Sequence, residues 1–184
     1  MLTNKITLLN FILLIVIPFI VSADTNMAFK LTDVDVIEIK NIPSSTVLIN
    51  RSDLPYFESK NLFMPLFWYI SMRQISMTTP VEVGVDPGEM IFFVDSKDLI
   101  KKPESTKSIS VEVIPERKVA SIGCKGGYSE ANFNKAKLKL IEWIHKQDKY
   151  IQIGEARLIY WDGPSTNNSE KRSEVHIQVE LKAQ

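Results

Sequence analysis

The spacing of apolar residues along the chain follows the same order twice. In the first half, two segments alternate apolar and polar residues ("DVIEIK", "STVLINR"), an aromatic segment follows ("LFMPLFWYI"), and two further segments alternate ("ISMTTPVEVGV", "EMIFFVDS"). The second half repeats this order with "SISVEVI", "KVASIGCKG", the helical pattern "SEANFNKAKLKLIEWIHKQDKY", "ARLIYWDG" and "RSEVHIQVEL". Alternation is typical of strands, and a longer period is typical of helices. The order predicts an α+β fold in which a strand-strand-helix-strand-strand unit is duplicated, giving a curved antiparallel sheet with two helices.

The predicted second helix has Ser129 as its N-cap residue and carries one apolar stripe. This stripe consists of Phe133, Ala136, Leu140, Ile141 and Ile144. His145 lies at the flank of the stripe, where a histidine is either an ordinary surface residue or a functional one.

The last predicted strand separates its residues between two faces. One face consists of Val175, Ile177, Val179 and Leu181, and the other consists of Arg172, Glu174, His176 and Gln178. The polar face is either solvated or lines a cleft. In a cleft, Glu174 and His176 would meet a polar or cationic group of a ligand.

The first 23 residues have the composition of a secretory signal peptide. Lys5 precedes an apolar run from Ile6 to Ile20, and the small residues Ser22 and Ala23 precede Asp24. We expect cleavage after Ala23, which leaves residues 24–184 as a single domain in a secreted, periplasmic or secretory-lumen protein. The alternative is an uncleaved membrane anchor, because the apolar run nearly reaches spanning length.

Composition narrows the possible functions. The chain has 22 basic and 22 acidic residues, so it has no basic footprint for nucleic acid. With Cys124 as the single cysteine, no intrachain disulfide can form, and this residue is a buried apolar side chain, a free thiol or an intermolecular link. Two histidines and one cysteine are too few to indicate a zinc site, and no nucleophile elbow, HExxH motif or P-loop is present. The sequons at Asn50 and Asn167 matter only in a eukaryotic secretory pathway.

Several motifs then occur in a fixed order. The aromatic segment ending in "YI" is followed by "ISMTTPVEV", "MIFFV", "KKPES", "VASIGCKGGYSEANF", "YWDGP" and "RSEVHIQV". In this order and with these gaps, residues from about Val36 to Leu181 resemble the SOUL haem-binding protein family. The stretch around Met77, Thr78 and Pro80 is the most specific part of the resemblance.

The resemblance implies a distorted, barrel-like antiparallel sheet with two helices, similar to the effector-binding domains of multidrug-sensing bacterial regulators. The absence of catalytic motifs already favours a binding protein over an enzyme, and the resemblance implies that the ligand is haem or another tetrapyrrole held by apolar contact near the first helix. Phe63, Leu66, Phe67 and Ile70 are then candidates for the pocket wall, with Met77 and Glu174 as further ligand-binding residues. Helical spacing alone does not separate such a wall from ordinary core.

Two features depart from the family pattern. Pro65 lies inside the first predicted helix, which therefore starts there or is kinked. No histidine occurs in "RSDLPYFES", just before this helix, where some family members have a proposed axial ligand. Possible iron ligands are therefore His176 and His145, or a methionine at position 64, 72 or 77.

Three functions follow in order of preference. The first is an exported carrier or scavenger of haem or another tetrapyrrole, which has no nucleic-acid partner and no stable membrane insertion once the signal peptide is removed. The second is a binding domain for another amphipathic or cationic small molecule, using Glu174. The third is an enzyme such as a hydrolase, with Glu174 as general base if burial raises its pKa.

Overall fold

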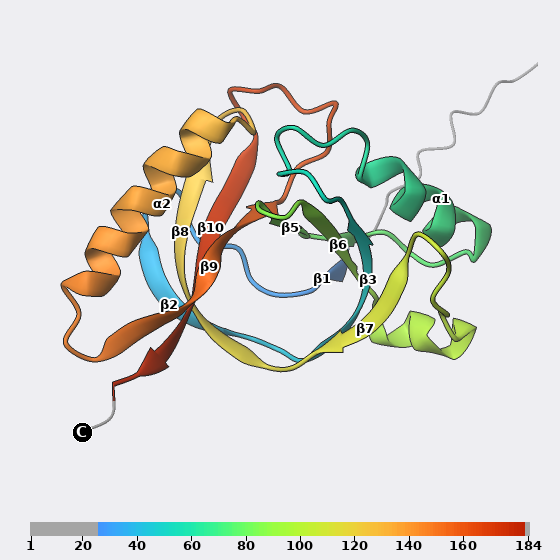
Figure 1. The fold of residues 1–184 in the computed structure, drawn as a ribbon, viewed down its shortest axis with the longest axis horizontal. Helices are drawn as coiled ribbons and strands as arrows, with labels where there is room; N and C mark the ends of the chain where they lie inside the picture. Colours follow the sequence, from blue (N-terminus) through green and yellow to red (C-terminus); the bar gives the residue numbers. More distant parts are fainter. Residues whose placement is uncertain (1–25, 183–184) are drawn as a thin grey trace, which may run out of the picture.

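A computed structural model of the chain describes residues 26–182, and Figure 1 shows their arrangement. The predicted signal peptide lies outside the described residues. The helices are α1 (Phe63–Met72), α2 (Glu130–His145) and the short 3-10 helix η1 (Ser96–Lys101). The strands are β1 (Asn26–Met27), β2 (Ile37–Ile42), β3 (Ser45–Arg51), β4 (Thr78–Thr79), β5 (Val81–Gly84), β6 (Glu89–Phe93), β7 (Ser110–Ile114), β8 (Arg117–Lys125), β9 (Tyr150–Tyr160) and β10 (Arg172–Leu181). Between residues 26 and 182, no helix is long and apolar enough to cross a membrane.

The main sheet has eight strands in the order β2-β8-β10-β9-β5-β6-β3-β7, and every pair in it is antiparallel. We take β2, β3, β5 and β6 as one unit and β7 to β10 as the other, and number each strand by its place within its unit. From either edge to the middle of the sheet, the strands are then the first, second, fourth and third of a unit. The first strand of each unit pairs with the second strand of the other unit. The predicted duplication and the α+β class are therefore confirmed. The sheet curls into a half-barrel with both long helices on its outside (Figure 1).

Helix α1 begins before the proline that was expected to start or kink it. Phe63 is its first residue, so Pro65 lies in the first turn. A backbone N–H has no partner in the first turn of a helix, so proline is tolerated there. The predicted second helix is also present, and the Ser129 hydroxyl accepts a hydrogen bond from Asn132 N at 3.2 Å as an N-cap. Of its predicted stripe, Ile141 is half-buried, and Phe133, Ala136, Leu140 and Ile144 are buried.

The stretch "ISMTTPVEVGV" was expected to form one strand, and that prediction is wrong. Pro80 separates β4 from β5, because proline has no N–H to donate to a ladder. The two residues of β4 pair in parallel with β1, in a small sheet of their own. The lysine-rich link between the two halves contains η1.

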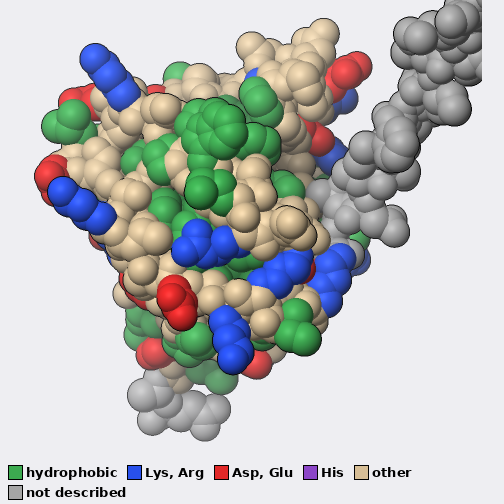
Figure 2. All heavy atoms as spheres, turned by 90° about the vertical axis from the view of Figure 1, so that its right-hand side faces the viewer, with side chains coloured by type: hydrophobic (Ala, Val, Ile, Leu, Met, Phe, Trp, Pro, Cys, Tyr) green, Lys and Arg blue, Asp and Glu red, His purple; other side chains and the backbone are tan. Residues whose placement is uncertain are grey.

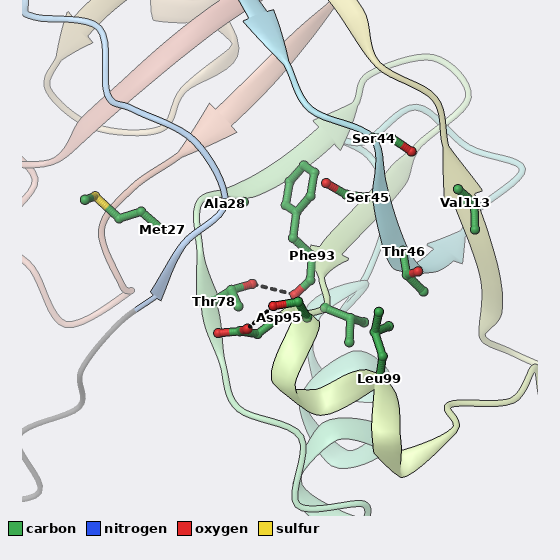
Figure 3. Close-up of a pocket in the computed structure, with 12 residues that line it drawn as sticks. Met27, Ala28, Ser44, Ser45, Thr46, Thr78, Phe93, Asp95, Leu99 and Val113 are labelled. Carbon is green, nitrogen blue, oxygen red and sulfur yellow. Dashed lines mark hydrogen bonds between the residues drawn. The ribbon is translucent and has the colours of Figure 1, made fainter.

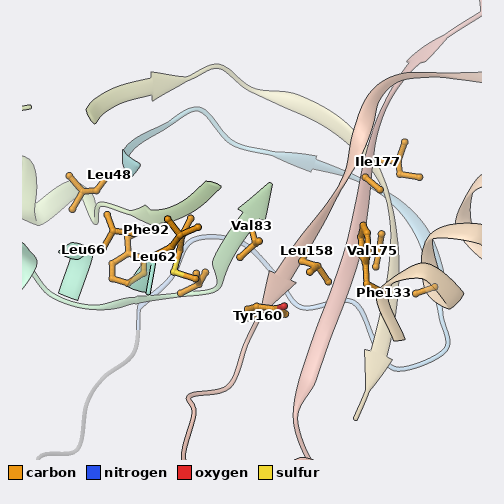
Figure 4. Packing of buried hydrophobic residues seen from close by; sticks show 14 of the residues in the cluster. Leu48, Leu62, Leu66, Val83, Phe92, Phe133, Leu158, Tyr160, Val175 and Ile177 are labelled. Carbon is orange, nitrogen blue, oxygen red and sulfur yellow. The ribbon is translucent and has the colours of Figure 1, made fainter. Parts of the chain in front are cut away.

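Hydrophobic residues pack on both faces of the curled sheet. The larger cluster lies between the sheet and the helices, and Figure 4 shows part of it, from Leu66 and Phe92 near α1 to Val175 and Phe133 near α2. The smaller cluster lies on the concave face and contains Phe29, Ile42, Val47, Ile49, Ile91, Phe93, Val119, Ile159 and Trp161. Cys124 is half-buried against the larger cluster.

Residues 26–36, which we call the strap, run through the inside of the curl (Figure 1). At the start of the strap, Ala28 N donates to Thr79 O at 2.7 Å, and at its end, Asp35 N donates to Gly123 O at 2.9 Å. A side chain at position 123 would collide with the strap, since a Cβ there would lie 2.1 Å from the main-chain oxygen of Asp33. Glycine at this position is therefore required for the close approach of the strap to β8.

Candidate functional site

The outer face of α1 is apolar and exposed. Helix α1 contains no charged residue, although it lies at the surface of the molecule. Trp68 is 58% exposed, Phe67 39% and Met72 80%. The rings of Phe63 and Phe67 are stacked, with centroids 5.8 Å apart and an angle of 17° between the planes. A surface helix normally has a polar outer face, so exposed aromatic side chains on this helix mark it as a candidate binding surface. We call Phe63, Phe67 and Trp68 the α1 aromatic surface.

A cleft of about 320 Å³ adjoins this surface at the start of α1. Its lining includes Tyr56, Phe57, Phe63 and Tyr128. Tyr128 stacks on Tyr160 with ring centroids 3.9 Å apart and donates a hydrogen bond from its hydroxyl to Arg172 O. Burial raises the pKa of Tyr128 to about 12, so its hydroxyl stays protonated at neutral pH. The cleft extends the aromatic area available to a flat ligand from α1 toward the loop before α2.

Basic residues lie beside both ends of α1. Lys60 is exposed three residues before the helix, and the guanidinium of Arg73, directly after it, lies 4.1 Å from the ring centroid of Tyr69. The η1 segment adds Lys97 and Lys101, which form ion pairs with Asp95 and Asp98. The segment is attached to the chain after α1 because Ser76 N donates to Asp98 Oδ2 at 2.7 Å. Figure 2 shows hydrophobic side chains gathered on this side of the molecule, with Lys and Arg side chains below them. The surface therefore suits a flat apolar ligand that carries acidic groups at its edge.

The other predicted wall residues of α1 are buried in the core. Leu66 and Ile70 are 0% and 4% exposed and belong to the large core cluster. Met77 is half-buried against the same cluster. Of the five apolar residues predicted to contact a ligand, Phe67 is exposed and Phe63 is half-buried at the edge of the aromatic surface. Leu66 and Ile70 lie three and seven residues after Phe63, so these residues share one side of the helix, and the ring of Phe63 itself packs edge-to-face on the buried Phe92 with centroids 5.3 Å apart.

Glu174 lies on the concave face of the sheet and is fully buried. Its Oε1 accepts hydrogen bonds from Thr32 N and Trp161 Nε1, both at 2.8 Å. Its Oε2 lies 2.6 Å from Lys40 Nζ, 2.7 Å from Ser121 Oγ and 2.6 Å from His176 Nε2. Of the two alternatives for the polar face of the last strand, the solvated one is wrong for Glu174 and His176. The sheet curls around them, and the strap covers them.

These contacts set the charge states of Glu174 and His176. Burial alone would raise the pKa of Glu174, but its hydrogen bond with His176 and its contact with Lys40 outweigh burial and hold the pKa at about 2. Burial lowers the pKa of His176, so the imidazole is neutral at pH 7 and donates its Nε2 proton to Glu174. A general base requires a raised carboxyl pKa and access to substrate. Glu174 has neither, so its predicted role as a general base is wrong for this structure.

The two histidines are not placed to ligate iron at the α1 aromatic surface. His145 is exposed at the end of α2, a helix that lies across the molecule from α1 (Figure 1), and His176 is a buried residue of β10. Met64 and Met72 are the two sulfur-containing residues of α1. Within residues 26–182, no group of three or more His, Cys, Asp or Glu side chains is placed to hold a metal ion.

Sequence reasoning missed two parts of these sites. Trp68 was not distinguished within the aromatic segment, although it is more exposed than Phe67; an aromatic residue at a helix position outside the apolar stripe is the signal that could have identified it. Tyr56 and Tyr128 line the same cleft although they are 72 positions apart, and no local pattern indicates this.

Comparison with known proteins gives a family and a fold. The family model described as SOUL heme-binding protein matches residues 25–178. The C-terminal domain of EcmrR has a TM-score of 0.62 with 20% identity over 79% of this chain and 97% of that domain. EcmrR in a complex with DNA has a TM-score of 0.60, again with 20% identity, over 79% of this chain and 57% of that one.

A protein described as a hydrolase from Listeria innocua has a TM-score of 0.57 with 14% identity, over 81% of this chain and 94% of that one. At these identities the solved structures establish a shared fold and not a shared activity. A search among curated proteins gave no significant match. The family match covers most of the described chain and agrees with the duplicated half-barrel. The chain therefore belongs to the SOUL haem-binding protein family.

Proposed function

We propose that this protein binds haem or a related tetrapyrrole on the α1 aromatic surface and acts as an exported carrier or scavenger. The observation that carries the proposal is the exposed, uncharged outer face of α1, with Phe67 and Trp68 on it and basic residues at its ends. A porphyrin is a large flat apolar ring with two propionates at one edge. Stacking on the aromatic rings would remove apolar area from water, at roughly 25 cal/mol for each Å². The basic residues would pair with the propionates.

The surface fits the ring better than it fits the iron. Neither histidine lies beside α1, and the sulfur ligands on the helix are Met64 and Met72. Contact with the ring and its propionates is therefore expected to provide most of the affinity. Iron-free protoporphyrin should bind about as well as hemin.

A titration followed by absorption in the Soret region tests the proposal. Saturable one-to-one binding is expected, and Phe67→Ala and Trp68→Ala should each weaken it by about tenfold, equivalent to ~1.4 kcal/mol. Leu138→Ala is the matched control, because Leu138 is 65% exposed on α2 and should leave binding unchanged. Equal binding by all three variants would exclude the α1 aromatic surface, and the absence of saturation would exclude tetrapyrrole binding.

Export rests on the sequence of residues 1–23 and is a separate part of the proposal. A secreted or periplasmic form that begins at Asp24 is expected, and the mass of the protein purified from its native compartment checks it. Retention of the full chain in a membrane fraction would favour the anchor alternative.

The runner-up function, binding of another amphipathic or cationic molecule at Glu174, requires the inside of the curl to open. In the described structure that carboxylate is fully buried and already bonded to five residues.

A further inference from the structure

The two most exposed large hydrophobic side chains among residues 26–182 lie on α1 and η1. Ile100 of η1 is 83% exposed, and Met72, the last residue of α1, is 80% exposed. Single exposed hydrophobic residues are common on protein surfaces, but a group of them marks a site of interaction.

The end of η1 is held at the end of α1. Lys101 Nζ donates a hydrogen bond to Gln74 O and lies 2.6 Å from Asp98 Oδ1. Gln74 is two residues after Met72, and Lys101 directly follows Ile100. Met72 and Ile100 therefore lie on neighbouring parts of one side of the molecule, outside the curl of the sheet (Figure 1).

The two apolar residues of η1 point in different directions. Leu99 lines a cavity of about 510 Å³ together with Thr46, Phe93 and other residues (Figure 3), and Ile100 does not line it. A 3-10 helix has about three residues per turn, so successive side chains point about 120° apart. Ile100 is thus directed away from the cavity and into solvent.

Trp68 extends this apolar group along α1. It lies four residues before Met72, and residues four apart share one side of a helix. Tryptophan is enriched where proteins meet a membrane–water interface, because its ring is apolar and its N–H is polar. We call Trp68, Met72 and Ile100 the docking surface. It adjoins the α1 aromatic surface, with which it shares Trp68.

Positive charge surrounds the docking surface. Segments 60–76 and 95–102, which contain α1, η1 and their flanking residues, carry five basic and two acidic residues. Their net charge is therefore +3, in a chain whose total charge is zero. Among the described residues, both acidic side chains pair with lysines of η1, and no carboxylate pairs with Lys60, Arg73 or Lys102. Figure 2 shows Lys and Arg side chains beside the hydrophobic ones on this side, which therefore complements an anionic surface.

We propose that the docking surface binds an anionic lipid bilayer, with its three apolar side chains in the interface and with Arg73 and Lys102 on the lipid phosphates. Binding is peripheral and reversible, because α1 and η1, of ten and six residues, are too short to span a bilayer. The apolar ring of a tetrapyrrole partitions into lipid, so docking places the α1 aromatic surface next to a source of such a ligand. This last step rests on the proposed function, whereas docking itself does not.

Sedimentation with vesicles tests the docking, using the mature form that begins at Asp24, without porphyrin. Vesicles with equal parts of phosphatidylcholine and phosphatidylglycerol should bind at least about tenfold more tightly than phosphatidylcholine alone, and added salt should reduce the difference. Met72→Ser and Ile100→Ser should each weaken binding by about fivefold or more. Leu138→Ser is the matched control, because Leu138 is 65% exposed on α2, and it should bind like the wild type.

Quenching of tryptophan fluorescence by brominated lipid identifies the side of the protein that enters the interface. Trp68→Phe should remove most of the quenching, whereas Trp143→Phe, at a half-buried residue of α2, should retain it. Equal binding to the two kinds of vesicle, binding that neither serine variant of the docking surface weakens, or quenching that survives Trp68→Phe would each overturn the proposal. So would a dimer in lipid-free solution that Ile100→Ser dissociates, because a second copy would then cover the surface.

A Soret titration without vesicles separates this proposal from the proposed function. Ile100→Ser should bind iron-free protoporphyrin like the wild type while it loses affinity for vesicles, because Ile100 lies outside the α1 aromatic surface. Docking on vesicles without any porphyrin binding would remove the proposed function and leave the docking surface. Porphyrin binding without docking would overturn the docking surface alone.

Discussion

Lys40 Nζ lies 2.6 Å from Glu174 Oε2 and so joins β2 to β10, which are the first and last strands of the main sheet along the chain and lie 134 positions apart at these residues. The carboxylate is fully buried, and the lysine side chain is 12% exposed. Because the strap also bonds to Glu174, this one carboxylate joins the strap, β2, β8, β10 and Trp161, the residue directly after β9. It is therefore an organising group of the concave face as well as a candidate ligand contact.

Removing the charge of Glu174 is expected to destabilise the fold. Glu174→Gln leaves the ammonium of Lys40 without its carboxylate in a mostly buried place, which costs about 3–5 kcal/mol. Glu112→Gln is the control, because the pair of Glu112 with Arg51 is about half exposed and contributes about 0–1 kcal/mol. Urea unfolding followed by circular dichroism measures both. Similar losses of unfolding free energy in the two variants would mean that the buried network stabilises the fold no more than an exposed ion pair does.

The stability of the protein should fall in two steps toward acid. Burial lowers the pKa of His176 below its ordinary 6.5, so the unfolded chain takes up this proton first, and the free energy of unfolding decreases below about pH 6.5. The pKa of Glu174 is held near 2 against an ordinary 4.5, so its contribution is lost as the pH falls from about 4.5 toward 2. Urea midpoints measured between pH 7.5 and pH 3 check both steps.

A substitution at each histidine separates the first step from general acid effects. His176→Gln should flatten the dependence above about pH 5, because the titrating ring is gone. His145→Gln should leave the curve unchanged, since His145 is exposed on α2. If the pH dependence of stability changed in His145→Gln and not in His176→Gln, the assignment of the first step to His176 would be contradicted.

Glycine at position 123 is expected to be essential for strap docking. In Gly123→Ala the new Cβ would lie 2.1 Å from Asp33 O, so the strap or β8 must move. Faster hydrogen exchange at the amides of Thr32 and Asp35 is the expected result. Gly163→Ala is the control, because a Cβ there has no atom within 4 Å outside the adjacent residues. Unchanged exchange in Gly123→Ala would show that the close approach is not maintained in solution.

Neighbouring residues of α1 should respond differently to truncation. Leu66→Ala removes a fully buried side chain and should cost about 2–5 kcal/mol of stability without a specific loss of porphyrin affinity in the remaining folded protein. Phe67→Ala, at a residue 39% exposed, should cost much less stability but weaken porphyrin binding. Thermal unfolding and Soret titration of both variants measure the two effects. A reversed pattern would place the ligand on the inner side of the helix.

The fold was largely predictable because the apolar pattern of each short segment indicates whether that segment forms a strand or a helix. The alternation in β10 and the stripe of α2 each indicate one element, and their repeated order indicates the duplication. The break at Pro80 and the η1 helix were missed. In the first case the apolar pattern continues through the proline, and in the second six residues rich in lysine have no hydrophobic period.

The sites were predictable only in part, because their residues meet across long separations. Phe63 and Phe67 follow from helical spacing, but which side of α1 faces the sheet is decided by packing against β3 and β6. The burial of Glu174 depends on Thr32, which is 142 positions away. No local pattern in the strap indicates that it lies inside the curl.

The central claim is that a tetrapyrrole binds on the α1 aromatic surface, and amide chemical-shift mapping with iron-free protoporphyrin tests it most directly. We predict saturable shifts confined to residues 60–73 and to the cleft around Tyr56 and Tyr128, with α2 unaffected. Shifts centred on α2 or on the concave face, or no saturable shifts, would contradict the account.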